Sequence, residues 1–148
     1  DRLDMNPYPL SFVQNAALAA LDRWIATGQP APSAPRMNVL DVDTRPTPVL
    51  DRFGNATGGV RTPYLDVPDR RYVAYGSGAV FCSIEGHSDP FDSAKLRELY
   101  RNGGRYLAAF KRSADGAVKA GFWLREDARS AVRQARATAD RIERASGR

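Results

Sequence analysis

The chain has 148 residues, 43% of them hydrophobic, which suits one domain with a modest core or a large part of one. Its 22 basic and 17 acidic side chains give a net charge of +5 and a pI of about 9.7. No apolar run approaches the roughly 18 residues that a membrane span needs, and residues 1–6 lack the pattern of a signal peptide. We therefore expect a soluble protein without membrane contact, in a compartment that the sequence does not reveal. The start without methionine suggests an internal start point, although removal of a tag or leader from a complete protein would give the same beginning.

A helix over residues 9–27 is the clearest predicted element. Gly28 suits the left-handed position that ends a helix, and Pro30 prevents its continuation. Residues 29–35 then form a proline-rich strap, for which an ordered spacer is favoured over a disordered linker. The apolar residues of the helix recur at steps of three and four, and they are Leu10, Val13, Ala17, Leu21, Trp24 and Ile25.

Short antiparallel strands are predicted in the middle of the chain. Pro46 and Pro48 confine one of them to an edge or an irregular region, because proline cannot donate to the ladder. Gly54 or Asn55 can take a positive φ in the turn that follows. The strand candidates are residues 37–42, 46–50, 60–67, 72–75 and 79–84.

Helices are predicted after Gly86. Asp92 or Ser93 caps a short helix, and residues 102–104 break it. A helix over residues 105–120 follows, with Tyr106 and Phe110 on its inner face, and the last helix covers residues 124–145 with a thin apolar stripe. The predicted fold class is therefore α+β, with an N-terminal helix, short antiparallel strands and C-terminal helices.

One block of the sequence resembles the signature of a branch of the α/β-hydrolase-domain proteins. Two further blocks agree with that family in consistent order, one within residues 6–32 and one within residues 86–128. Ala31, His87 and Ser88 depart from the family pattern. The signature block reads Asp51-Arg52-Phe53-Gly54-Asn55-Ala56-Thr57-Gly58-Gly59-Val60-Arg61-Thr62-Pro63-Tyr64-Leu65-Asp66-Val67-Pro68.

The resemblance implies that the chain is part of a larger α/β-hydrolase fold that cleaves a small-molecule ester. It implies a catalytic serine far upstream and a general base shortly before Asn6. Residues 1–35 would supply the final core helix and strap of the hydrolase domain, with Trp24 as an anchor against its sheet. Residues 36–86 would form a short-strand region, and residues 87–148 a C-terminal helical extension. The expected partner is the upstream part of the hydrolase, or a second copy of the chain.

The chain lacks the Gly-x-Ser-x-Gly elbow that exposes a hydrolase nucleophile. His87 is the only histidine, so any Ser-His-Asp triad within the chain would need it. Ser83, Ser88 and Asp89 are near it in sequence, but triad members converge from separate segments, and a surface or turn histidine is favoured. We therefore expect no catalytic residue in this chain, and we expect the isolated chain to be inactive.

Arg61 and Asn55 are the two candidate binding residues. A guanidinium in an apolar run needs a carboxylate or several carbonyls, so Arg61 either pairs with Asp51, Asp66 or an upstream acid, or contacts a substrate carboxylate at a pocket rim. Asn55 is expected to support its own turn.

No cofactor or metal is expected. The glycines of the signature block do not have phosphate-loop spacing. A single cysteine, Cys82, excludes an intrachain disulfide and a cysteine zinc site, and a buried inert thiol is its expected state.

An alternative function is a stand-alone basic module that binds nucleic acid or an acidic protein through the last helix. Arg129, Arg133 and Arg136 would carry that contact. Acidic residues interleave with these arginines, which favours a solvated helix face and makes nucleic acid an unfavoured partner. The two functions predict different surfaces: a hydrolase segment leaves the apolar face of residues 10–25 uncovered, whereas a stand-alone module buries it.

Overall fold

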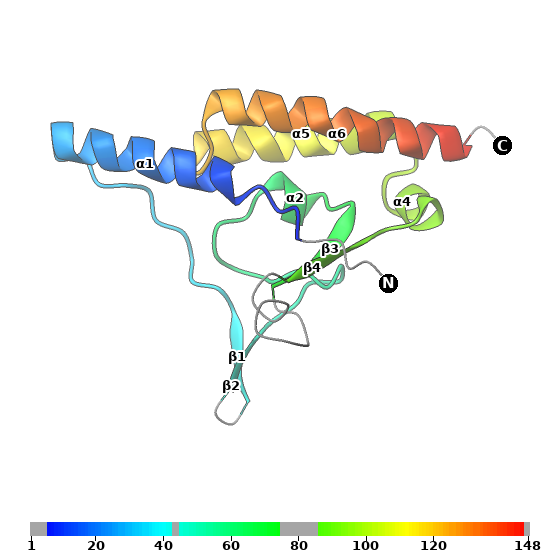
Figure 1. Ribbon diagram of the computed structural model, residues 1–148, viewed down its shortest axis with the longest axis horizontal. Helices are drawn as coiled ribbons and strands as arrows, with labels where there is room; N and C mark the ends of the chain where they lie inside the picture. The colour runs from blue at the N-terminus through cyan, green and yellow to red at the C-terminus, as the bar shows by residue number, and fades with distance from the viewer. Residues whose placement is uncertain (1–5, 43–44, 75–85, 147–148) are drawn as a thin grey trace.

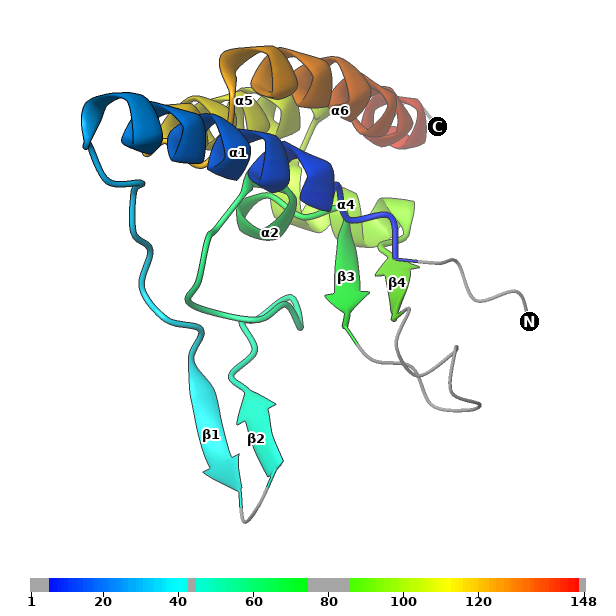
Figure 2. The same ribbon diagram turned by 60° about the vertical axis from the view of Figure 1, so that its left-hand side comes forward.

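The computed structural model describes residues 6–42, 45–74 and 86–146, and within them the fold is α+β, as predicted (Figure 1). Helices α1, α5 and α6 lie along one side of the molecule, with α2 and the β3–β4 hairpin beneath them (Figures 1 and 2). None of the described helices has the length and apolar character needed to cross a lipid bilayer. The elements are α1 (Leu10–Thr27), β1 (Val39–Val42), β2 (Arg45–Pro48), α2 (Pro63–Asp66), β3 (Arg70–Val73), β4 (His87–Pro90), α4 (Ser93–Tyr100), α5 (Gly103–Lys119) and α6 (Arg125–Ser146).

The core forms between the antiparallel helices α5 and α6. Asn102 caps α5, because its side chain accepts a hydrogen bond from the Arg105 backbone N–H at 2.8 Å. Gly103 at the start of α5 touches the α6 backbone at Ala139, so the two helices approach closely there. The alanine-rich stripe of α6 fits this close approach and is buried. The buried core includes Val67, Leu96, Tyr106, Phe110, Ala114, Ala117, Trp123, Ala128, Ala131, Ala135, Ala139 and Ile142.

Helix α1 is apolar on two sides. Ala16 and Ala20 are buried, and the ring of Phe12 packs edge-on against Trp123 at 5.4 Å. Gly28 ends the helix with a φ of 74°, as predicted. The strap then passes the turn after α5, where Pro32 lies against Gly121. The large apolar side chains on the other side of α1 are exposed, and they are Leu10, Leu18, Leu21, Trp24 and Ile25.

Two separate hairpins replace the predicted run of strands. Strands β1 and β2 pair antiparallel, with Val39 opposite Pro48, and this hairpin extends away from the helices (Figures 1 and 2). Strands β3 and β4 pair with Arg70 opposite Pro90 and Val73 opposite His87. The predicted strand at residues 79–84, with Cys82 and Ser83, lies outside the described residues.

The predicted strand over residues 60–67 is wrong, because Pro63–Asp66 form the short helix α2. Thr62 is extended and its carbonyl accepts hydrogen bonds from the N–H groups of Leu65 and Asp66, while Pro63 takes the first helical position. Helices also do not begin directly after Gly86, since residues 87–90 form β4. The division into segments 1–35, 36–86 and 87–148 remains a prediction, and β4 pairs with β3 across its second boundary.

Candidate functional site

The signature block begins with a tight turn that Asp51 organises. Its Oδ1 accepts hydrogen bonds from the backbone N–H groups of Phe53 at 2.9 Å and Asn55 at 3.0 Å. The Asp51 and Asn55 main chains also bond each other, and Gly54 has a φ of 79° that a side chain would strain. The Asp51 carboxylate and the positive φ of Gly54 therefore both stabilise this turn.

Arg61 joins both ends of the signature block. Its Nε donates to Asp66 Oδ1 at 2.9 Å and its Nη2 donates to Asp51 Oδ2 at 3.3 Å. Its other bonds go to the carbonyl oxygens of Ala56 at 2.8 Å and Leu65 at 2.9 Å. Burial lowers the pKa of Arg61, but the hydrogen bonds and charges of Asp66 and Asp51 outweigh burial and raise the pKa. Of the two roles left open by the sequence, the structure places Arg61 in the internal pairing.

A pocket of about 420 Å³ lies beside this arginine. Gly58, Gly59, Arg61 and Asp66 line it from the signature block, and Ser113 lines it from α5. Ser113 Oγ donates a hydrogen bond to Asp66 Oδ2 at 2.9 Å. Arg61 therefore borders a pocket, but four of the five N–H donors of a guanidinium already have partners within the protein. A polar ligand there would meet the Asp66 carboxylate and the Ser113 hydroxyl in a lining that is otherwise mostly apolar.

Asn55 is fully buried and connects the turn to β3. Its Oδ1 accepts a hydrogen bond from the Tyr72 backbone N–H at 2.7 Å, and its Nδ2 donates to the Arg70 carbonyl at 3.4 Å. The turn itself is supported by the Asp51 side chain, so the expectation that Asn55 supports its own turn is wrong. A binding role for Asn55 or Arg61 remains a prediction.

His87 lies on a strand and not in a turn. Successive strand residues face opposite sides, so His87 and Asp89 share one face of β4 and Ser88 points to the other. His87 Nε2 lies 3.8 Å from Asp89 Oδ1, whereas Arg71 binds Asp89 through Nε at 2.9 Å and Nη2 at 2.6 Å. Ser88 is buried and its Oγ accepts from Arg70 at 3.3 Å. The local geometry therefore separates Ser88 from His87.

Asp69 is the centre of a polar cluster that the sequence analysis missed. Its Oδ1 accepts from Arg70 Nε at 3.0 Å, and its Oδ2 accepts from Thr138 Oγ1 at 2.8 Å. Arg141 Nη2 lies 3.8 Å from the same oxygen. The only sequence signal was the spacing of Thr138 and Arg141, which places both on one face of the last helix. Among the residues that the structure describes, no group of three metal-ligating side chains gathers, at Asp69 or elsewhere.

Tyrosines surround Asp69 and make this region sensitive to alkaline pH. Burial raises the pKa of Tyr64 to about 12, with the charge of Asp69 adding to the effect. The same two causes raise the pKa values of Tyr72, Tyr100 and Tyr106. The folded protein therefore holds phenol protons that the unfolded chain loses near pH 10.

Stability should consequently fall as the pH rises above about 10. The contribution of Tyr64 is fully present below about pH 10 and is lost as the pH rises toward its folded pKa of about 12. Each tyrosine can lower the free energy of unfolding by at most about 1.4 kcal/mol per pH unit, and partly exposed rings by less. Urea unfolding at several pH values measures this decline. Tyr64→Phe should make the decline of stability with pH shallower. An equal decline in both proteins would contradict a contribution of Tyr64.

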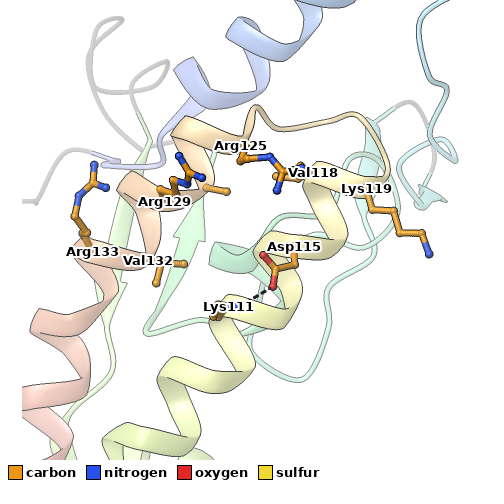
Figure 3. Close-up of a pocket in the computed structure, with 9 residues that line it drawn as sticks. Lys111, Asp115, Val118, Lys119, Arg125, Arg129, Val132 and Arg133 are labelled. Carbon is orange, nitrogen blue, oxygen red and sulfur yellow. Dashed lines mark hydrogen bonds and ion pairs between the residues drawn. The ribbon is translucent and has the colours of Figure 1, made fainter.

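A groove of about 790 Å³ lies between the second half of α5 and the first half of α6 (Figure 3). Lysines of α5 and arginines of α6 line it, together with one acid, Asp115, whose carboxylate binds Lys111 at 3.1 Å. Apolar side chains form the rest of its surface. The basic helix face expected from the sequence is therefore one wall of a groove with an apolar base, and Arg136 is not among the residues that line it.

The sequence model of a protein family described as an alpha/beta hydrolase domain matches residues 1–133. That range contains the signature block and all elements up to the first half of α6. No curated protein and no solved structure matched the chain.

Proposed function

The chain belongs to the alpha/beta hydrolase domain family, and from this premise we propose that it is the C-terminal part of a serine-type ester hydrolase. In this role it completes the hydrolase core and forms part of the wall of the substrate cleft. The nucleophile and the general base belong to residues that precede this chain. The substrate is a small-molecule ester.

The observation that carries the proposal is the two-sided apolar surface of α1. One side packs on the chain's own α5–α6 turn through Phe12. On the other side the exposed fractions are 66% for Leu18, 50% for Trp24 and 79% for Ile25. A helix with apolar side chains on two sides is typical of one that is covered on both of them. A sheet contributed by the upstream part of a hydrolase would cover the exposed side of α1. Trp24 would then pack against that sheet and anchor the helix to it.

The internal bonding of the signature block supports a structural role for this segment. Arg61 and Asn55 use their polar atoms to hold α2, β3 and the turn in place. A rigid block of this kind can support a cleft wall, and the pocket lined by Arg61 and Ser113 is the candidate for that wall.

Self-association of the purified chain tests the proposed interface. The uncovered side of α1 should make the chain associate as its concentration rises, because burying apolar surface is favourable in water. The double variant Leu18→Glu/Ile25→Glu should be monomeric, whereas the control Ala26→Glu, at an exposed position of α1 outside this apolar face, should associate like the original chain. Sedimentation velocity measures both. A monomeric original chain that does not bind a hydrophobic dye would contradict the proposal.

A further inference from the structure

The groove between α5 and α6 combines an excess of positive charge with an apolar base. Lys111 and Lys119 lie on α5, and Arg125, Arg129 and Arg133 lie on α6. Figure 3 shows the arginines rising from one helix and the Lys111–Asp115 pair on the neighbouring helix. Within the described part of the chain, no hydrogen bond or ion pair occupies the three arginines or Lys119. Four cations are thus free to meet an anionic partner.

The base of the groove is formed by Val118, Ala128 and Val132. Val118 and Val132 are partly buried and rest on the hydrophobic core, so they present a fixed apolar surface. Positively charged side chains that only contact water need no apolar surface between them. An apolar strip between two rows of positive charge instead matches a partner that is apolar in the middle and acidic at its edges.

The length of the groove matches a short helix. Its lining runs over residues 111–119 of α5 and residues 125–133 of α6, eight steps in each case. At 1.5 Å per residue each wall is about 12 Å long, or roughly two helical turns. Two packed helices present a natural groove for a third helix, whose residues at i, i+3, i+4 and i+7 would face the base.

We propose that this groove binds an acidic amphipathic helix of a partner protein. Aliphatic side chains of the partner contact Val118, Ala128 and Val132, and its flanking carboxylates pair with the α6 arginines and the α5 lysines. The groove shares no residue with the exposed side of α1 or with the signature block. The two proposals therefore rest on different surfaces of this chain.

Nucleic acid fits the groove less well than an acidic helix does. Phosphates would pair with the cations, but the apolar base would face a ribose-phosphate backbone without gain. Among the described residues, no aromatic side chain lines the groove, so unpaired bases would find no stacking surface there. The contacts that distinguish the two partners are therefore the apolar ones.

A fluorescein-labelled synthetic peptide of about 15 residues tests the proposal, because it is longer than the groove and can complete its helix on binding. The peptide carries leucine at the i, i+3, i+4 and i+7 positions, glutamate at the positions that flank them and alanine elsewhere, and a scrambled peptide of the same composition is the reference. We expect saturable binding by fluorescence anisotropy, at least about tenfold weaker for Arg129→Glu/Arg133→Glu. The control Arg105→Glu/Arg144→Glu changes the net charge equally at the opposite end of the two helices and should change binding by less than about twofold. Circular dichroism checks that each variant is folded.

Several outcomes would overturn the proposal. They are equal loss in the two charge-reversal variants, equal binding of the scrambled peptide, or no binding of the amphipathic peptide. Tighter binding of duplex DNA than of the peptide, with the same loss in the groove variant, would assign the groove to nucleic acid instead. The variant Leu18→Glu/Ile25→Glu should bind the peptide like the original chain, and its failure to do so would place the peptide on α1.

Discussion

Replacing Gly103 by alanine should lower the free energy of unfolding by about 2–3 kcal/mol. Gly103 is the first residue of α5, where the helix touches the backbone of α6. A Cβ at this position would overlap the Ala139 carbonyl oxygen and lie 2.8 Å from its carbonyl carbon. Backbone atoms cannot move aside as a flexible side chain can, so the two helices would have to separate. Their separation would also weaken the hydrogen bond from the Gly103 N–H to Glu143, now 2.8 Å long.

Gly104→Ala is the matched control for this prediction. Gly104 is exposed, and the nearest atom to a Cβ there is Asn102 Oδ1 at 3.5 Å, an ordinary contact. This change should leave stability unchanged or raise it by up to about 1 kcal/mol, because alanine reduces the freedom of the unfolded chain. Urea unfolding followed by circular dichroism measures both variants. Equal effects at positions 103 and 104 would show that the close approach of α5 and α6 does not limit the side chain.

Removing the guanidinium in Arg61→Met should destabilise the protein by about 2–4 kcal/mol. The change leaves the carboxylates of Asp51 and Asp66 without their cation and the carbonyls of Ala56 and Leu65 without a donor. The side chain of Asp51 is only 17% exposed, so water replaces the lost bond poorly. Partial exposure of Arg61 itself, at 30%, keeps the cost below that of a fully buried pair.

Arg71→Met is the matched control, because Arg71 also binds a carboxylate with two nitrogens. Both Arg71 and its partner Asp89 are nearly half exposed, so this pair should contribute about 1 kcal/mol or less. Arg61→Lys should recover only part of the loss, since an ammonium cannot reach four acceptors in one plane. A cost for Arg61→Met no larger than that for Arg71→Met would mean that Arg61 does not hold the signature block together.

Local signals in the sequence predicted the helices well. Gly28, Asp92 and Asn102 act within a few residues of their own positions, and each lies at a helix end in the structure. The strand prediction at residues 60–67 failed because its apolar composition outweighed the signal of Pro63, which starts α2. Strand β4 was missed because its pairing with β3 depends on residues far away in sequence.

In the candidate site too, interactions between residues near in sequence could be predicted, whereas those between distant residues could not. The pairing of Arg61 with Asp51 and Asp66 was foreseen, because a guanidinium among apolar residues requires a nearby acid. The cluster around Asp69 was not, since Thr138 lies 69 residues away and only the packing of α6 brings it close. Asn55 likewise binds β3, which no local pattern indicates.

The exposed surfaces favour the hydrolase segment over the stand-alone module. A stand-alone module was expected to bury the apolar face of residues 10–25, and Leu21 and Trp24 instead remain about half exposed. The basic residues of α6 nevertheless line a groove with an apolar base. Partner binding by that groove is compatible with a structural role of the chain in a hydrolase, because the two surfaces are separate.

Reaction with a fluorophosphonate, followed by intact-mass spectrometry, tests most directly whether the catalytic serine lies outside this chain. Such reagents form a covalent adduct with a serine that a neighbouring base activates. We predict no adduct on the purified 148-residue chain, because Ser88 is buried and faces away from His87. A stoichiometric adduct on a serine of this chain, abolished by His87→Ala, would contradict the proposed function.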